Sequence, residues 1–314
     1  MNSIVDSAVA DVQLRIVAGP TGAGKSALAL DLADRHGALI VSADSRQIYI
    51  GFSVGTAAPT VTDRARVPHR GIGYVEATER WSAARWARDA WGWIADATER
   101  GQPVIVVGGT GLWLRALVQP LADEPPMDPE QRARLRDVLS AFDTPTLRQW
   151  VETLDPSRAA LGRVQLIRAA EIALLTGTRA SDWHAAGAAK PRARARWLIV
   201  DPQESLPASL AARVDAMLTQ GWRDEVEALC QMVPPDAPAW NACGYREIRD
   251  WVEGRITQTA VREAIVIRTR QYAKRQRTWF RNQLHDEPDV LRLDPRSTDA
   301  LERADRWLFD GGST

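Results

Sequence analysis

Cysteine and histidine are scarce in this sequence. Its 314 residues include two cysteines, Cys230 and Cys243, and four histidines, and the cysteines do not form a C-x-x-C pair. This scarcity argues against a disulfide-stabilised secreted domain and against a structural zinc site. It favours a reducing compartment, so we expect a cytoplasmic protein.

Long apolar runs and an excess of charge of one sign are also missing. No 18 apolar residues follow one another, and the opening stretch MNSIVDSAVADVQ has neither the basic start nor the apolar run of a signal peptide. We therefore expect no membrane segment. The 40 basic and 40 acidic residues give a formal net charge of zero, which argues against a protein that coats nucleic acid indiscriminately. A local basic patch is compatible with this balance.

The first third of the chain alternates between strand and helix. Apolar runs predict buried strands at 14–19, 38–44 and 103–109, and helices are expected at 25–36 and 81–101. Strands that are apolar throughout and separated by helices are typical of a parallel sheet covered on both faces. We therefore predict an α/β protein with a P-loop NTPase-like parallel sheet flanked by helices.

The alternation stops at the proline-rich stretch QPLADEPPMDP, after which residues 130–185 are predicted to be helical. A strand returns at 195–202, which indicates a helical insertion domain within an α/β core. We assign residues 123–189 to the insertion. The P-loop α/β core then comprises residues 12–122 and 190–314, including the C-terminal helices.

Loops and helices complete this prediction. A loop that contains Pro59 and Pro68 is expected before the helix at 81–101, and a second loop is expected in the Ala- and Arg-rich stretch at 185–196. Beyond Ser205 the chain is predicted to be mostly helical, with a long helix at 257–284. A short strand, VLRLD, and a last helix follow.

The stretch GPTGAGKS matches the phosphate-loop motif G-x-x-x-x-G-K-[ST] and lies between an expected strand and an expected helix. The backbone amides of such a loop surround a diphosphate, the lysine adds positive charge, and the final hydroxyl can hold a magnesium ion. We predict a diphosphate- or nucleotide-binding site here, with Mg²⁺ as cofactor held through Ser26. The residues of the loop are Gly19, Pro20, Thr21, Gly22, Ala23, Gly24, Lys25 and Ser26.

Two further strand ends are expected to face the same crevice, because the carboxyl ends of parallel strands carry the ligand sites of open α/β sheets. Asp44 ends the second strand, and the third ends in Gly108, Gly109 and Thr110. A nucleoside-triphosphate hydrolase usually has an acidic residue at this third position, where it helps to hold magnesium. The site is therefore predicted to be poorly equipped for ATP hydrolysis.

A basic stripe is expected on the long C-terminal helix. From Arg262 to Arg281, seven residues are basic and one, Glu263, is acidic. At 100° per residue, four of the cations fall on one face of the helix, with aromatic residues nearby. Cations that follow a phosphate backbone, with aromatic rings for stacking, are typical of proteins that bind single-stranded RNA. The cations are Arg270, Lys274, Arg277 and Arg281, and the aromatic residues are Tyr272, Trp279 and Phe280.

In this order along the chain, the motifs resemble those of the tRNA dimethylallyltransferase family, also called tRNA isopentenyltransferases. The similarity runs from about residue 14 to residue 281 and rests on GPTGAGKS, DSRQIYIGFSVGTAAPT, VPH, VGGTGLWLRAL, MDPEQRARL, RAAEIALLTGT, CGYREI and RTRQYAKRQRTWFR. The chain departs from the family pattern at Ala58, where a lysine is common, and at Val164. In addition, RGIG follows VPH, and the insertion is shorter.

The resemblance implies that the phosphate loop holds dimethylallyl diphosphate. The enzyme would transfer the dimethylallyl group to the exocyclic amine of the adenine 3′ of the anticodon in tRNA and release diphosphate. In that role Asp44 is the general base for a poorly nucleophilic amine. Lys25, Thr110 and Arg132 would stabilise charge on the departing diphosphate, together with Mg²⁺ held through Ser26.

The resemblance also implies that the chain binds the tRNA anticodon stem-loop, with the C-terminal helices of the core as RNA-binding elements. Nothing in the sequence suggests more than a monomer, so we expect a monomer. The residues that match RNA-contacting segments of the family are Asp44, Ser45, Arg46, Gln47, Gln165, Arg168, Asn241, Ala242, Cys243, Gly244, Tyr245, Arg246, Lys274, Arg275, Gln276, Arg277, Thr278, Trp279, Phe280 and Arg281.

Three other functions are compatible with parts of the sequence. A P-loop small-molecule kinase would bind ATP in the loop and use Asp44 as the base for a hydroxyl, but the basic helix would then have no role. An adenylate isopentenyltransferase would prenylate free nucleotides, which the basic helix also disfavours. A non-enzymatic RNA-binding protein would leave the phosphate loop and Asp44 without a function.

Overall fold

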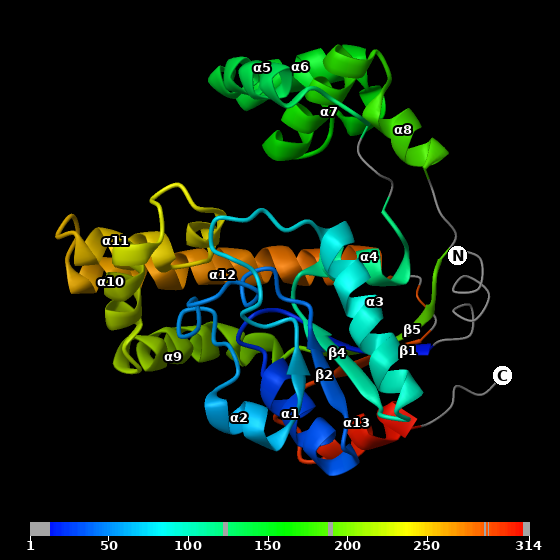
Figure 1. Cartoon of the computed structure of the whole chain (residues 1–314), viewed down its shortest axis with the longest axis vertical. Helices are drawn as coiled ribbons and strands as arrows, with labels where there is room; N and C mark the ends of the chain where they lie inside the picture. The colour runs from blue at the N-terminus through cyan, green and yellow to red at the C-terminus, as the bar shows by residue number, and fades with distance from the viewer. Residues whose placement is uncertain (1–12, 122–124, 188–190, 286, 288, 310–314) are drawn as a thin grey trace. The chain divides into compact units, whose positions relative to one another are not determined.

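The computed structural model describes residues 13–121, 125–187, 191–285, 287 and 289–309, and within these ranges six strands form one parallel sheet (Figure 1). The strands lie in the order β3-β2-β4-β1-β5-β6. They are β1 (Gln13–Ala18), β2 (Leu39–Ser42), β3 (His69–Arg70), β4 (Val104–Gly108), β5 (Arg194–Val200) and β6 (Val290–Leu293). The side chains of the central strands are buried, as expected for a parallel sheet covered on both faces. The predicted fold class is confirmed.

The chain divides into two compact units. The first, which contains the sheet, comprises Met1–Val118 and Arg192–Thr314, and we call it the α/β unit. The second comprises Gln119–Pro191, and we call it the helical unit.

Helices cover both faces of the sheet in the α/β unit. Helix α1 (Lys25–His36) packs on β1, β2 and β4, and α13 (Ala300–Phe309) packs beside it. Helices α3 (Ala83–Glu99) and α4 (Gly111–Val118) lie on the opposite face (Figure 1). The carboxyl ends of the strands remain uncovered between these layers, which is where ligand sites form in such sheets.

Four more helices follow β5 in the α/β unit. They are α9 (Leu206–Thr219), α10 (Trp222–Met232), α11 (Tyr245–Val252) and α12 (Gln258–Gln283), with 3₁₀ turns η2 (Gln203–Ser205) and η3 (Pro238–Asn241). Helix α12 begins after Thr257, whose hydroxyl accepts a hydrogen bond from the Ala260 amide at 3.3 Å. It contacts α4, α9 and α11. The long helix predicted at 257–284 is therefore confirmed, and it links elements that are distant in sequence.

The helical unit has a core of its own. Its elements are α5 (Pro129–Ala141), α6 (Thr144–Leu154), the 3₁₀ turn η1 (Pro156–Arg158), α7 (Arg163–Thr176) and α8 (Ala180–Ala186). The carboxylates of Asp128 and Asp143 cap the amino ends of α5 and α6. Leu139, Val151 and Leu166 are fully buried where α5, α6 and α7 meet.

Two segments predicted to be loops contain regular structure. Between Pro59 and Pro68, a capping box formed by Thr60 and Asp63 starts the short helix α2 (Val61–Arg66), and β3 follows. In the stretch 185–196, β5 already begins at Arg194, because its first residues pair with β1. The first loop prediction was wrong at α2 and β3, since very short elements give little periodic signal. The second differs only in its boundary with the predicted strand at 195–202.

None of the helices in the described ranges combines the length and the apolar character that a membrane-spanning helix requires.

Candidate active site

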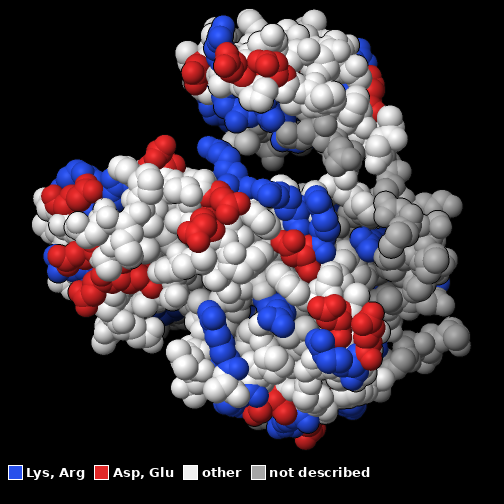
Figure 2. Space-filling model, viewed as in Figure 1, with Lys and Arg blue, Asp and Glu red and all other residues white. Residues whose placement is uncertain are grey.

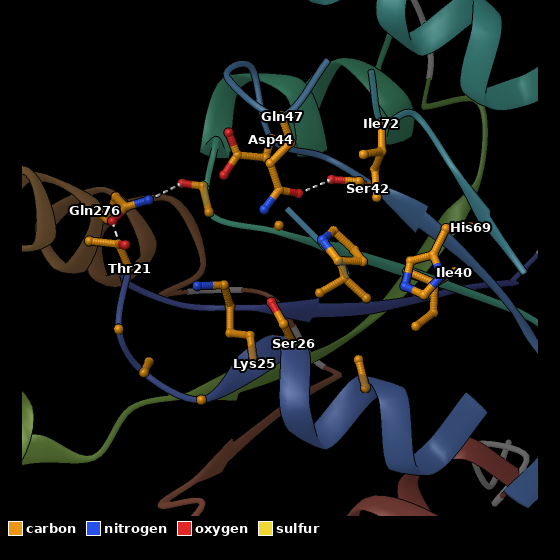
Figure 3. A pocket seen from close by; sticks show the side chains of 18 of the residues that line it. Thr21, Lys25, Ser26, Ile40, Ser42, Asp44, Gln47, His69, Ile72 and Gln276 are labelled. Atoms are coloured by element: carbon orange, nitrogen blue, oxygen red, sulfur yellow. Dashed lines mark hydrogen bonds between the residues drawn. The ribbon is translucent and has the colours of Figure 1, made fainter. Parts of the chain in front are cut away.

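The phosphate loop forms the turn between β1 and α1, and it lines a solvent-open pocket of about 690 Å³. Figure 3 shows Lys25 and Ser26 on one side of this pocket and Asp44 on the opposite side. Within the described residues, the backbone amides of Gly24, Lys25 and Ser26 donate to no protein acceptor, as expected for the first turn of a helix. These amides are available to an anion at the positive end of α1.

Two cations belong to this pocket. Lys25 Nζ donates to the carbonyl oxygen of Pro20 at 2.6 Å, and Arg213 of α9 also lines the pocket. Burial and the neighbouring charge of Arg213 lower the pKa of Lys25 to about 8. Burial likewise lowers the pKa of Arg213, and the charge of Asp44 opposes that shift. A bound diphosphate would compensate both cations, so the pocket favours a multivalent anion.

Arg213 was missed in the sequence analysis, although the sequence contains a signal for it. The residues of α9 that face the core are Leu210, Val214 and Met217. Arg213 follows the first of these by three positions and precedes the last by four, so it lies on the same face. A cation on the buried face of a helix needs an anionic partner or a ligand.

Asp44 and Thr110 come from the ends of neighbouring strands, β2 and β4. The half-buried carboxylate of Asp44 accepts a hydrogen bond from the backbone amide of Arg46 at 2.8 Å. The Thr110 hydroxyl accepts from the backbone amide of Ser45 at 3.2 Å, and the Thr110 amide donates to the carbonyl oxygen of Ala43 at 3.4 Å. Thr110 therefore holds the turn that carries Asp44 into the pocket.

The side-chain amide of Gln47, predicted to contact RNA, is used inside the protein. Its Nε2 donates to the carbonyl oxygens of Thr56 and Ala57 at 3.2 and 3.0 Å. Its Oε1 accepts from the Ser42 hydroxyl at 2.9 Å, as Figure 3 shows. Gln47 thus fixes the loop at 56–57 against the pocket, and it is half-buried and lines the pocket itself. Its contact with RNA stays a prediction.

Glu225 of α10 anchors the same loop and was also missed. Its carboxylate accepts hydrogen bonds from the backbone amides of Ser53, Val54 and Gly55 at 2.9, 2.7 and 3.4 Å. It also accepts from the hydroxyl of Tyr245 at 2.7 Å. A single carboxylate therefore holds a loop that has no regular structure of its own.

A second pocket, of about 570 Å³, adjoins the first. Its walls include the apolar side chains of Met217, Trp222 and Ile265. Four residues line both pockets: Thr21, Asp44, Arg213 and Tyr272. Burial and the charge of Asp44 raise the pKa of Tyr272 to about 12, so its phenol is neutral near pH 7. Asp44 therefore lines both the phosphate pocket and a second pocket, whose walls combine these apolar side chains with Arg46 and Arg213.

Part of the run from Lys274 to Arg281 faces the protein. Gln276 and Phe280 are 7% and 2% exposed, and the guanidinium of Arg277 forms two hydrogen bonds with the carboxylate of Asp201. The side chains of Gln276 and Phe280 therefore pack against the protein, and RNA contact at these two positions stays a prediction.

The other part of the run faces solvent. Lys274, Arg275 and Arg281 are exposed, and Thr278 and Trp279 are half-buried. Figure 2 shows Lys and Arg side chains gathered in the upper part of the visible face of the α/β unit. RNA contact by Lys274, Arg275 and Arg281 stays a prediction.

The segment from Asn241 to Arg246 is divided in the same way. Ala242, Gly244 and Tyr245 are buried, and RNA contact by this segment stays a prediction. Asn241 and Arg246 are exposed and hydrogen-bonded to each other at 2.5 Å. Between them, Cys243 lines the second pocket, and burial raises the pKa of its thiol.

The remaining predicted residues lie in the helical unit. Arg132 Nε donates to the fully buried carboxylate of Glu171 at 3.1 Å, and Arg136 binds the same carboxylate. On α7, Gln165 is exposed and Arg168 is half-buried. The catalytic role of Arg132 and the RNA contacts of α7 stay predictions.

The described residues contain no group of three or more His, Cys, Asp or Glu side chains that could hold a metal ion. The exposed hydroxyl of Ser26 lines the phosphate pocket at the start of α1. This donor fits Mg²⁺, which usually takes most of its ligands from water and substrate phosphates rather than from the protein. Mg²⁺ as cofactor stays a prediction.

Comparisons with known proteins agree with the motifs. A family model described as IPP transferase matches residues 47–283, and one described as isopentenyl transferase matches residues 12–68. The tRNA dimethylallyltransferase of Rhodospirillum centenum is 41% identical over 296 residues, which cover 92% of this chain and 93% of that protein. The tRNA dimethylallyltransferase of a Caulobacter species is 40% identical over 294 residues, which cover 91% of this chain and 94% of that protein.

Solved structures show the same similarity. A tRNA isopentenylpyrophosphate transferase from Bacillus halodurans is 28% identical, with a TM-score of 0.66 and coverage of 94% of this chain and 95% of that chain. A eukaryotic dimethylallyltransferase acting on tRNA is 26% identical, with a TM-score of 0.75 and coverage of 93% and 77%. With matching family models, high coverage and a common fold, this chain is a transferase that belongs to the IPP transferase family.

Proposed function

We propose that this enzyme transfers a dimethylallyl group from dimethylallyl diphosphate to the exocyclic amine of the adenine 3′ of the anticodon in tRNA and releases diphosphate. The observation that carries this proposal is the place of Asp44 between two adjoining pockets. The cationic pocket suits the diphosphate. The second pocket, with Trp222 and Ile265 in its walls, suits a flat purine ring.

The reaction needs a base on the acceptor side. The adenine amine forms a bond to the first carbon of the allyl group, and the bond from that carbon to the diphosphate oxygen breaks. The electron pair leaves with diphosphate, and the proton of the amine passes to the carboxylate of Asp44. A carboxylate within hydrogen-bond reach of the amine facilitates attack because the nitrogen lone pair is delocalised into the ring.

On the donor side, negative charge grows on the departing diphosphate. The free amides at the start of α1, together with Lys25 and Arg213, are positioned to stabilise that charge. Mg²⁺ bound through Ser26 would add Lewis-acid stabilisation of the leaving group. Thr110 acts through the turn that it holds at Ser45, and so positions Asp44.

tRNA as the acceptor is supported by the relatives, which carry the name tRNA dimethylallyltransferase. Exposed cations on α12, namely Lys274, Arg275 and Arg281, supply charge for a phosphate backbone. A kinase reaction has less support, because β4 ends in Gly108 where a hydrolase-type site would have an acidic residue. Action as a cytoplasmic monomer belongs to the same proposal.

The test is transfer of label from radiolabelled dimethylallyl diphosphate, with Mg²⁺, into unmodified tRNA or into AMP. We expect label in tRNA only. Replacement Asp44→Asn keeps the oxygen that accepts from the Arg46 amide but removes the base, so we expect a loss of at least about a hundredfold in kcat. Asp236→Asn, at an exposed aspartate, is the matched control. Label in AMP but not in tRNA would move the assignment to free nucleotides, and label in neither would overturn it.

A further inference from the structure

Gln276 was expected to face RNA, yet it is buried and both ends of its side-chain amide are engaged. Its Oε1 accepts a hydrogen bond from the backbone amide of Thr21 in the phosphate loop at 2.8 Å. Its Nε2 donates to the carbonyl oxygen of Gly109, in the turn after β4, also at 2.8 Å. Figure 3 shows the side chain reaching Thr21 at the edge of the pocket. One residue of α12 therefore bridges the turns that follow β1 and β4, and these turns form the site proposed for dimethylallyl diphosphate.

The chemistry of this bridge requires an amide. Thr21 offers an N–H and Gly109 offers a carbonyl oxygen, so the bridging group must accept at one end and donate at the other. A leucine of similar size does neither, and an ionised glutamate cannot donate. The bond to Gly109 is buried, so its loss leaves a main-chain carbonyl without a partner, and loss of the part-buried bond from Thr21 releases the phosphate loop from α12.

The glycines after β4 show that α12 is closely fitted to this turn. A Cβ on Gly109 would lie 2.3 Å from Nε2 of Gln276, and a Cβ on Gly111 would lie 2.3 Å from the ring of Trp279. Residues 276 and 279 are three positions apart and lie on one face of α12. The absence of side chains at the two glycines thus leaves room for Gln276 and Trp279 on one face of α12. This close fit is evidence for the contact that does not depend on the hydrogen bonds.

The outer side of α12 carries exposed cations next to this bridge. Lys274 and Arg275 immediately precede Gln276 and face solvent. An RNA that binds these cations restrains the same helix turn that holds the phosphate loop. The helix therefore connects the surface proposed for tRNA with the loop proposed for diphosphate, through one buried amide.

We propose that Gln276 is a positioning residue that couples the two substrates: it holds the phosphate loop in its diphosphate-binding arrangement, and RNA bound on the outer side of α12 strengthens that hold. This inference rests on the proposed function. Coupling of this kind is reciprocal, so RNA tightens diphosphate binding by the same factor as diphosphate tightens RNA binding. We expect a factor of about ten in the native enzyme.

The first test separates the two substrates. Gln276→Leu should raise KM for dimethylallyl diphosphate about tenfold and change KM for tRNA less than about twofold, because the lost bonds are on the donor side. Gln271→Leu makes the same chemical change at an exposed position of the same helix and should leave both constants unchanged. A rise confined to KM for tRNA would overturn the inference and return Gln276 to an RNA-contacting role.

The second test measures coupling without turnover. The Kd of inorganic diphosphate with Mg²⁺ is determined by calorimetry, with and without an unmodified anticodon stem-loop RNA. Native enzyme should bind diphosphate more tightly with RNA, and Gln276→Leu should lose this difference. An unchanged difference in the variant contradicts the inference. If native enzyme fails to prenylate tRNA, the proposed function fails, whereas diphosphate coupling is still measured by this experiment.

A double-mutant cycle covers the case in which Gln276→Leu does not fold. Gly109→Ala places a methyl group against Nε2 of Gln276 and should weaken diphosphate binding by displacing the amide. In Gly109→Ala with Gln276→Ala, the shorter side chain leaves room for the methyl group, so the double variant should bind diphosphate no worse than Gln276→Ala alone. Additive losses in the double variant would show that the two positions act separately.

Discussion

The phosphate loop and the run from Lys274 to Arg281 on α12 were both predicted as continuous binding motifs, but only the loop uses its consecutive residues for one purpose. In the loop, binding relies on backbone amides, which the consecutive residues Gly24, Lys25 and Ser26 leave available. On α12, binding would rely on side chains, and helix geometry directs successive side chains to different sides. Consequently Gln276 and Phe280 face the protein, whereas Lys274 and Arg281 face solvent.

This comparison teaches that a sequence motif has a different meaning in a turn and in a helix. A motif in a turn can be assigned as a block. A motif in a helix must first be divided by its period of 3.6 residues, and each side then has its own function. On α12 the inner side supports the donor site and the core, and the outer side is the surface available to a partner.

The largest expected effect that tests this division is on stability. Phe280→Ala removes a large side chain that is 2% exposed, so we expect the free energy of unfolding to fall by about 3–5 kcal/mol. Urea denaturation followed by tryptophan fluorescence measures this loss. Ile267→Ala, on the same helix but 54% exposed, is the control and should cost less than about 1 kcal/mol. Native-like stability of Phe280→Ala with weakened tRNA binding would show that Phe280 is an RNA contact after all.

Much of the fold and part of the site could be predicted from the sequence. The strands of the parallel sheet and the phosphate loop are local features, because apolar runs and a fixed spacing of glycine, lysine and serine specify them. The short elements α2 and β3 were missed, because elements of six and two residues carry almost no periodic signal.

The residues that complete the site were harder to predict, because they are single charges far from any motif. Arg213 and Glu225 reach the site from α9 and α10, and only the folded chain brings them to the phosphate loop and to the loop at 53–55. A signal was present for both. Glu225 lies three positions after buried Trp222 and four before buried Leu229, so it is a charge on a buried helix face, as is Arg213.

An effect of intermediate size is expected on the affinity of the phosphate loop for dimethylallyl diphosphate when pH changes. The pKa of Lys25 is lowered to about 8, so the free enzyme loses this cation as pH rises above that value. A bound diphosphate favours the protonated form, hence affinity for dimethylallyl diphosphate should fall by about fifteenfold in total between pH 8 and 9.5. Calorimetry without tRNA measures this affinity, and the enzyme should take up a proton when dimethylallyl diphosphate binds in this pH range.

Lys25→Arg provides the control for this pH dependence, because a guanidinium stays charged throughout the range. Its affinity for dimethylallyl diphosphate should be flat between pH 7 and 9.5, whatever its absolute value. A flat profile in the native enzyme, or the same slope in Lys25→Arg, would show that another group controls the pH dependence.

The smallest expected effect is on the outer side of α12. Arg281 is exposed, so Arg281→Ala should weaken tRNA binding only about two- to fivefold and reduce the slope of log Kd against log salt by about 0.7, as expected for one lost phosphate contact. Filter binding over a salt series measures both quantities. Arg262→Ala is the matched control, because Arg262 lies on the same helix but its Nε is paired with Asp215 at 2.6 Å. An equal change of slope in both variants would mean that general charge, rather than the outer side of α12, determines RNA binding.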